Sequence, residues 1–168
     1  MTLNELGFLY NFHDSIISTP LKQINNDIYV AFSLDNFWQS NNFKEKYKDI
    51  ISNTDYDIFI YLKFNNCSQI KGIKETFLNK KGSSKRKKIT STKTEVPITD
   101  ITDNNIDNPQ FIEALIPYKD NIFYAVFVND FGKNHISFCC DNVEVIKEEV
   151  VKINSKTYLD FYEGNLKF

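Results

Sequence analysis

The clearest strand signal in this chain is Asp27-Ile28-Tyr29-Val30-Ala31-Phe32-Ser33-Leu34-Asp35. Because successive side chains of a strand point to opposite faces, this segment would present one continuous apolar face, made of Ile28, Val30, Phe32 and Leu34. The other face would carry a mixture, namely Tyr29, Ala31 and Ser33. The pattern predicts a strand with one face in the core.

The residues before this segment predict its partner strand. Residues 16–24 also have β character, and the two segments are separated only by Asn25-Asn26. Asparagine tolerates the positive φ angles of a tight turn, so we expect a hairpin here.

Further strands are expected along the rest of the chain. The segments are 56–64, 67–73, 111–117, 122–129 and 136–144, with 157–162 as a last short strand or turn. Residues 3–10 have the spacing of a short helical turn, and residues 36–53 form either a short amphipathic helix from Phe43 onward or a long loop.

These segments define a fold class. The expected strands follow one another through short connections without helical crossovers, which implies antiparallel pairing. We therefore expect a mainly β protein: an antiparallel twisted sheet, sandwich or partial barrel built from hairpins, with one or two short helices. A length of 168 residues fits a single domain, 1–168.

The composition changes between residues 79 and 108. The run Lys80-Lys81-Gly82-Ser83-Ser84-Lys85-Arg86-Lys87-Lys88 is followed by a segment rich in Thr, Ser, Asp and Asn. We interpret 79–108 as an exposed, mobile excursion within the domain, and we expect its lysine-rich stretch, 80–88, to be dispensable for folding.

Charge and targeting features narrow the function classes. The net charge is −2 and Arg86 is the single arginine, which disfavours nucleic-acid binding because base and phosphate recognition favours arginine. The N-terminal residues lack the features of a signal peptide, and no apolar run approaches the roughly 18 residues of a membrane span. We expect a cytoplasmic protein with its three cysteines, Cys67, Cys139 and Cys140, reduced.

The segment His13-Asp14-Ser15 contains the residue types of a hydrolase triad. Adjacent residues cannot align as nucleophile, base and orienting acid, because catalytic triads assemble from separated segments. We therefore interpret His13, Asp14 and Ser15 as a structural motif, in which Asp14 or Ser15 fixes a turn and His13 packs against Tyr10 and Phe12.

Metal and cofactor sites are not indicated. The two histidines, His13 and His135, and the three cysteines lack the close spacing of zinc ligands. The acidic residues of the chain lack the glycine turn and terminal glutamate of a calcium loop. The five glycines form no phosphate-binding loop, so we expect no metal and no cofactor.

Four short segments carry a family resemblance: Phe12-His13-Asp14-Ser15-Ile16-Ile17, Phe32-Ser33-Leu34-Asp35, Ile60-Tyr61-Leu62-Lys63-Phe64-Asn65-Asn66-Cys67 and Ile136-Ser137-Phe138-Cys139-Cys140-Asp141-Asn142-Val143-Glu144-Val145. In this order the chain resembles small bacterial β-proteins with a His-Asp-Ser motif, a group that includes immunity proteins of polymorphic toxin systems. The resemblance implies a non-enzymatic protein that binds and neutralises a partner toxin.

Two alternatives stay open, a small hydrolase or ligand-binding enzyme centred on His13 and Asp14, and a structural domain. For a toxin inhibitor we expect exposed aromatic and acidic side chains to carry the binding, since interface energy concentrates in a few anchors. The candidates are Trp38, Asp141 and Glu144. Trp38 could instead cover one end of the core.

Overall fold

The computed structural model describes residues 1–78, 90–102, 111–115, 121–129 and 132–168. In these ranges the chain forms ten β-strands, four α-helices and one short 3-10 helix. The strands are β1 Ile16–Ile17, β2 Lys22–Ile24, β3 Asp27–Ser33, β4 Tyr56–Asn65, β5 Ser68–Leu78, β6 Thr90–Val96, β7 Phe111–Leu115, β8 Ile122–Asn129, β9 Gly132–Cys139 and β10 Asn142–Lys152. The helices are α1 Leu3–Leu9, α2 Asn41–Lys46, α3 Lys48–Ile51, η1 Ile98–Asp100 and α4 Lys156–Tyr162.

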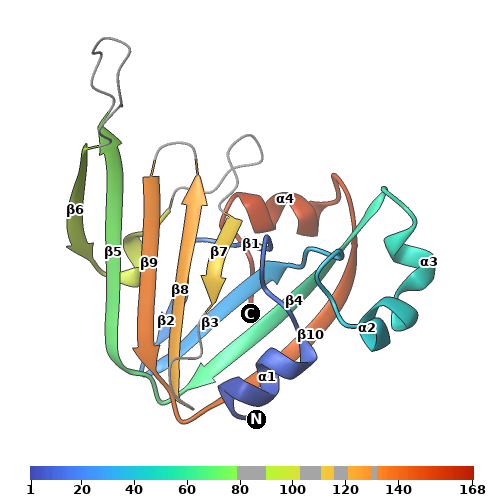
Figure 1. Ribbon diagram of the computed structural model, residues 1–168, viewed down its shortest axis with the longest axis horizontal. Coiled ribbons are helices and arrows are strands. Elements are labelled where there is room, and N and C mark those ends of the chain that lie inside the picture. The colour runs from blue at the N-terminus through green and yellow to red at the C-terminus, as the bar shows by residue number, and fades with distance from the viewer. Residues whose placement is uncertain (79–89, 103–110, 116–120, 130–131) are drawn as a thin grey trace.

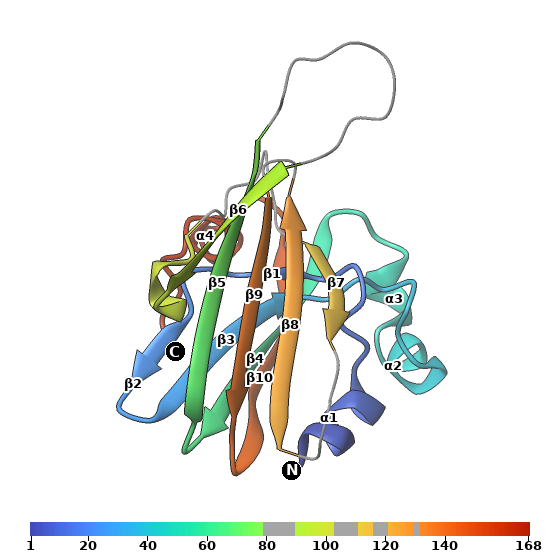
Figure 2. The ribbon, with the colours of Figure 1, turned by 60° about the vertical axis from the view of Figure 1, so that its left-hand side comes forward.

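All ten strands belong to one antiparallel sheet. Its order is β10-β4-β3-β1-β7-β8-β9-β5-β6, and β2 pairs with β3 outside this path. The sheet bends so that β3, β4 and β10 lie across β5, β8 and β9, as Figures 1 and 2 show. The expected mainly β, antiparallel fold is confirmed, although four short helices accompany it where one or two were expected.

The main core lies between the two halves of this bent sheet. Phe64 of β4 packs against Phe123 of β8 and Phe138 of β9, with ring centroids 4.9 and 5.0 Å apart, although these strands are not neighbours in the sheet. The apolar face expected for β3 is buried here. Each fully buried side chain of this size contributes roughly 1.5–3 kcal/mol.

A second apolar cluster lies on the opposite face of β3 and β4, where α4 covers Ala31 and Phe59. The expectation of a strand or turn at 157–162 was wrong. Ser155 caps the helix by accepting a hydrogen bond from the Tyr158 N–H, and Phe161 packs against Phe59 at 4.3 Å between ring centroids. The aromatic spacing that resembled a strand instead follows one face of a helix.

Two expected strands are each divided in the structure. Residues 16–24 form β1 and β2, interrupted near Pro20, which has no N–H for a sheet ladder. The segment 136–144 contains the end of β9 and the start of β10, with Cys140 and Asp141 between them. The β2–β3 hairpin has the expected asparagine turn, since Asn25 has a φ of 53°.

The described part of 79–108 belongs to the sheet and the core, although residues 91–95 are exposed. Strand β6 pairs with β5 along its whole length, and η1 follows it. Ile98 and Ile101 are buried in the main core, so this part of the segment contributes to packing. Residues 79–89, which include the lysine-rich run, and 103–108 lie outside the described residues.

Helices α1, α2 and α3 lie on the side of the molecule next to β10 (Figure 1). Glu148 of β10 accepts hydrogen bonds from the Tyr10 and Tyr47 hydroxyls and from the Lys46 ammonium. Burial alone would raise the pKa of this carboxyl, but these three donors outweigh it and hold the pKa below its ordinary value. This carboxylate ties the helical segments to the sheet.

Candidate functional site

The His13-Asp14-Ser15 motif forms the turn between α1 and β1. Asp14 has a φ of 57°, and its backbone N–H donates to the Ile112 carbonyl of β7 at 3.1 Å. Ser15 is fully buried, and its hydroxyl oxygen accepts a hydrogen bond from the Asp35 N–H at 3.1 Å. Ser15 therefore joins this turn to the loop that follows β3.

The side chains of His13 and Asp14 face Trp38. The Trp38 Nε1–H donates to Asp14 Oδ2 at 2.8 Å, and His13 Nδ1 lies 3.0 Å from the same oxygen. The His13 ring packs against Trp38 with centroids 4.6 Å apart. The expected packing of His13 on Tyr10 and Phe12 was wrong, because those two rings turn into the core. The structure thus brings the structural motif together with the candidate anchor, since Asp14 contacts Trp38, which follows it by 24 positions in the sequence.

A buried glutamine holds the loop that carries Trp38. Gln39 is 4% exposed, and its amide nitrogen donates to the Asn11 carbonyl at 2.5 Å and to the Asp35 carbonyl at 2.9 Å. Its amide oxygen accepts from the Asn11 N–H at 3.1 Å. The Phe37 N–H donates to Asp35 Oδ1 at 2.7 Å. These bonds fix loop 35–39 against residues 11–15.

The rings carried by this fixed loop point away from the core. Phe37 is 74% exposed and Trp38 is 42% exposed, and their centroids lie 5.0 Å apart in an edge-to-face arrangement. Lys44 donates to the Phe37 carbonyl and lies over the Phe37 ring. We call His13, Phe37, Trp38 and Lys44 the Trp38 surface. Neither apolar cluster described above includes Trp38.

Asp141 and Glu144 lie elsewhere, at the turn from β9 into β10. Asp141 accepts a hydrogen bond from the Asn66 side chain at 3.0 Å, and Glu144 accepts one from Asn65 at 2.7 Å. Asn65 ends β4, whereas the loop with Trp38 leaves β3 near the beginning of β4, where Ser33 pairs with Phe59. The acidic candidates and the Trp38 surface therefore lie at opposite ends of the β3–β4 pair.

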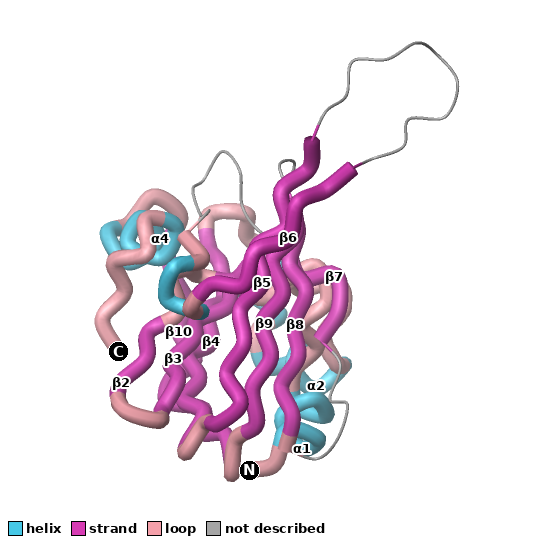
Figure 3. Tube along the Cα trace, turned by 90° about the vertical axis from the view of Figure 1, so that its left-hand side faces the viewer, coloured by secondary structure: helices cyan, strands magenta, loops and turns pink. Residues whose placement is uncertain are grey.

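His135 occupies a different polar site on the outer face of the sheet. Its Nδ1 lies 3.2 Å from the Tyr124 hydroxyl and its Nε2 lies 3.4 Å from Glu75 Oε2, so β8, β9 and β5 contribute one residue each. A hydrogen bond from Ser91 holds the pKa of the Glu75 carboxyl below its ordinary value. We call Tyr124, His135 and Glu75 the Tyr124–His135–Glu75 row. The sequence did not predict it, because the proximity of these side chains depends on the register of three strands. Figure 3 shows this side of the molecule, with no described α-helix in front of β5, β8 and β9.

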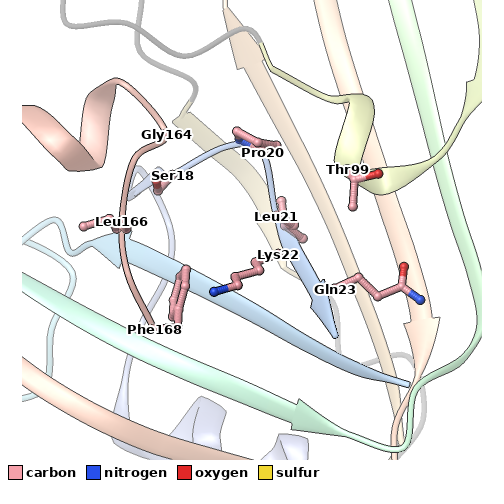
Figure 4. Close-up of a pocket in the computed structure, with 9 residues that line it drawn as sticks. All are labelled: Ser18, Pro20, Leu21, Lys22, Gln23, Thr99, Gly164, Leu166 and Phe168. Atoms are coloured by element: carbon pink, nitrogen blue, oxygen red, sulfur yellow. The ribbon is translucent and has the colours of Figure 1, made fainter. Parts of the chain in front are cut away.

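Two shallow cavities lie near the C-terminal segment. One has a volume of about 270 Å³ and lies between β2 and that segment, lined by residues that include Leu21, Gly164 and Phe168 (Figure 4). The other has a volume of about 420 Å³ and is lined in part by Tyr61 and Asp160. Neither cavity is lined by His13 or His135.

Within the described ranges, no three His, Cys, Asp or Glu side chains are grouped as a metal ion would require. No described helix is long and apolar enough to cross a membrane. Comparison of the chain with protein-family models, with curated proteins and with solved structures gives no match.

Proposed function

We propose that this chain is a non-enzymatic protein-binding domain that neutralises a partner toxin in the cytoplasm, using the Trp38 surface as its anchor. The observation that carries this proposal is the combination of exposed aromatic rings with a fixed backbone. Phe37 and Trp38 remain accessible while Gln39, Asp35 and Ser15 hold the loop beneath them. Tryptophan is the residue type most enriched among binding hot spots.

Fixing the loop in advance matters for affinity. A flexible loop would lose conformational entropy on binding, roughly 0.5–1.5 kcal/mol for each side chain that becomes immobilised. The hydrogen bonds of Gln39 and the contact between Trp38 and Asp14 already restrict these residues in the free protein. This arrangement favours the anchor over the alternative that Trp38 covers the core.

The acidic candidates have a separate role in the proposal. Asp141 and Glu144 are bonded to asparagine amides, and neither belongs to an ion pair among the described residues. Exposed carboxylates at this end would attract a basic partner and set its approach, since charge complementarity mainly affects association rate and orientation. A toxin that acts on nucleic acid is a basic partner of this kind.

The experiment is capture of the partner from the native cell, followed by co-expression. We expect the wild-type chain to retain one protein and to relieve the growth arrest that this protein causes when it is expressed alone. Phe37→Ala combined with Trp38→Ala should lose both effects. The matched control is Ile24→Ala. Ile24 is 43% exposed and belongs to β2, where it pairs with Asp27 at the end of β3 that lies away from the Trp38 surface. Relief by the double variant at wild-type strength would contradict the proposed anchor.

A second candidate function rests on the Tyr124–His135–Glu75 row. In the tautomer with the ring proton on Nε2, that proton faces the Glu75 carboxylate and Nδ1 is free to accept the Tyr124 proton, which is the arrangement of a nucleophile beside a general base. If the chain is an enzyme, the phenol oxygen would attack the ester carbonyl, the ester C–O bond would break, and the alcohol would leave with the proton that His135 took from Tyr124. Water would then hydrolyse the acyl-tyrosine to the carboxylic acid and restore the phenol. Hydrolysis of an activated ester that Tyr124→Phe and His135→Gln both abolish would support this function, and equal rates in all three chains would exclude it.

A further inference from the structure

The three cysteines lie where the turns β4–β5 and β9–β10 meet. The terminal pair of the β5–β9 ladder is Ser68 with Cys139. The ladder ends at this pair, and the next residues along the two chains are Cys67 and Cys140, which are close enough to interact electrostatically. Continuing the antiparallel register by one residue would set these two cysteines opposite each other. Both are buried in the main core, 5% and 3% exposed.

The side chains of this pair point to the same face of the sheet. Paired residues of antiparallel strands share a face, and successive residues alternate, so Cys139 points outward and is partly exposed. Cys67 and Cys140 both point inward. In the structure the Cys67 thiol donates to the Phe64 carbonyl at 3.4 Å.

The backbone bonds define the type of pair. The Cys67 N–H donates to the Asn26 carbonyl at 2.5 Å, and the Cys140 N–H donates to the Asn121 carbonyl at 2.9 Å. The two cysteines are therefore not hydrogen-bonded to each other. If the register continues to these two residues, they take a non-hydrogen-bonded position, in which Cα atoms are about 4.5 Å apart. This separation falls within the range that a disulfide spans, roughly 4.4–6.8 Å.

We propose that Cys67 and Cys140 are an oxidative cross-linking site, which closes into a disulfide when the cell meets a small peroxide. In the first step one thiol is oxidised to a sulfenic acid and hydrogen peroxide is reduced to water. In the second step the other thiol sulfur attacks the sulfenic sulfur, the S–S bond forms, and the hydroxyl leaves as a second water. Overall, two thiols and one hydrogen peroxide give one disulfide and two waters.

Burial sets the rate of this reaction. Burial raises the pKa of Cys67 to about 12 and that of Cys140 to about 11, and each thiol lies near another cysteine that adds to the effect. Since the thiolate is the reactive form, we expect slow oxidation at neutral pH and faster oxidation as the pH rises. Once formed, the cross-link joins two turns that are far apart in the sequence and restricts the unfolded chain. The oxidised protein should melt at a higher temperature than the reduced protein.

The test is mass spectrometry of the chain after treatment with hydrogen peroxide and alkylation of the remaining thiols. We expect a peptide pair joined through Cys67 and Cys140, in the wild-type chain and in Cys139→Ser alike. In Cys140→Ser this linked pair should be absent. The increase in melting temperature should occur with the cross-link and disappear after reduction by dithiothreitol.

Two results would overturn the proposal. One is a cross-link that contains Cys139. The other is a Cys139→Ser chain in which Cys67 and Cys140 are still alkylated separately after prolonged peroxide treatment at alkaline pH. Cys139→Ser changes only the outward-facing thiol, so its fold serves as the reference for both results.

Discussion

Gln39→Ala tests whether the loop beneath Trp38 is held by the buried amide. The substitution removes the partners of the Asn11 N–H, the Asn11 carbonyl and the Asp35 carbonyl. A buried polar group that loses its partner costs roughly 1–3 kcal/mol. Asn11 is exposed and Asp35 half-buried, so water would reach part of this site. We therefore expect a loss of about 2–3 kcal/mol in the free energy of unfolding.

Urea unfolding followed by tryptophan fluorescence measures this loss, since Trp38 is the single tryptophan and lies next to Gln39. Gln23→Ala is the matched control, because Gln23 is exposed and its amide makes one hydrogen bond, to the Asn25 carbonyl. We expect this control to stay within about 0.5 kcal/mol of wild type. Equal stability of the two variants would refute the reasoning that Gln39 fixes the loop.

Three further predictions concern carboxylates. Asp14→Ala should lower the free energy of unfolding by about 1 kcal/mol, because Trp38 loses its acceptor; an unchanged urea midpoint would count against this. The pKa of Glu148 is held below its ordinary value of 4.5, so the ionised carboxylate stabilises the fold. The wild-type chain should therefore melt at a higher temperature than Glu148→Gln above pH 4.5, and this difference should disappear in more acidic solution. Burial raises the pKa of Asp57, whose carboxylate accepts a hydrogen bond from the Ser33 hydroxyl at 2.5 Å. Asp57→Asn should therefore increase the free energy of unfolding at neutral pH, and this gain should vanish below pH 3.8, the ordinary pKa. A decrease in the free energy of unfolding at neutral pH would refute this prediction.

Parts of the fold could be predicted from local patterns. Strand β8 has the expected bounds, because its apolar run ends at clear turn residues on both sides. The β2–β3 hairpin follows from Asn25-Asn26 in the same way. Local patterns failed at α4, because the spacing of Tyr158, Phe161 and Tyr162 is compatible with one face of a helix and the short apolar segment is also compatible with a strand. They also failed at the β9–β10 turn, which contains neither Gly nor Pro.

The candidate site depended on contacts that no local pattern contains. His13, Asp14 and Trp38 were each singled out for their chemistry, yet their proximity results from Ser15 and Gln39 joining two loops. Tyr124, His135 and Glu75 meet only because β8, β9 and β5 pair in one register. Register depends on the whole sheet, and a single sequence does not reveal it.

The most direct test of the Trp38 surface is the affinity of Trp38→Ala for the captured partner, measured by calorimetry beside urea unfolding of the same variant. We predict that the dissociation constant rises at least about 30-fold, equivalent to roughly 2 kcal/mol, as expected for a hot-spot anchor. The free energy of unfolding should fall by no more than about 1 kcal/mol, the value of one hydrogen bond to a half-exposed acceptor. Unchanged affinity in a folded Trp38→Ala chain would contradict the proposed function of this surface.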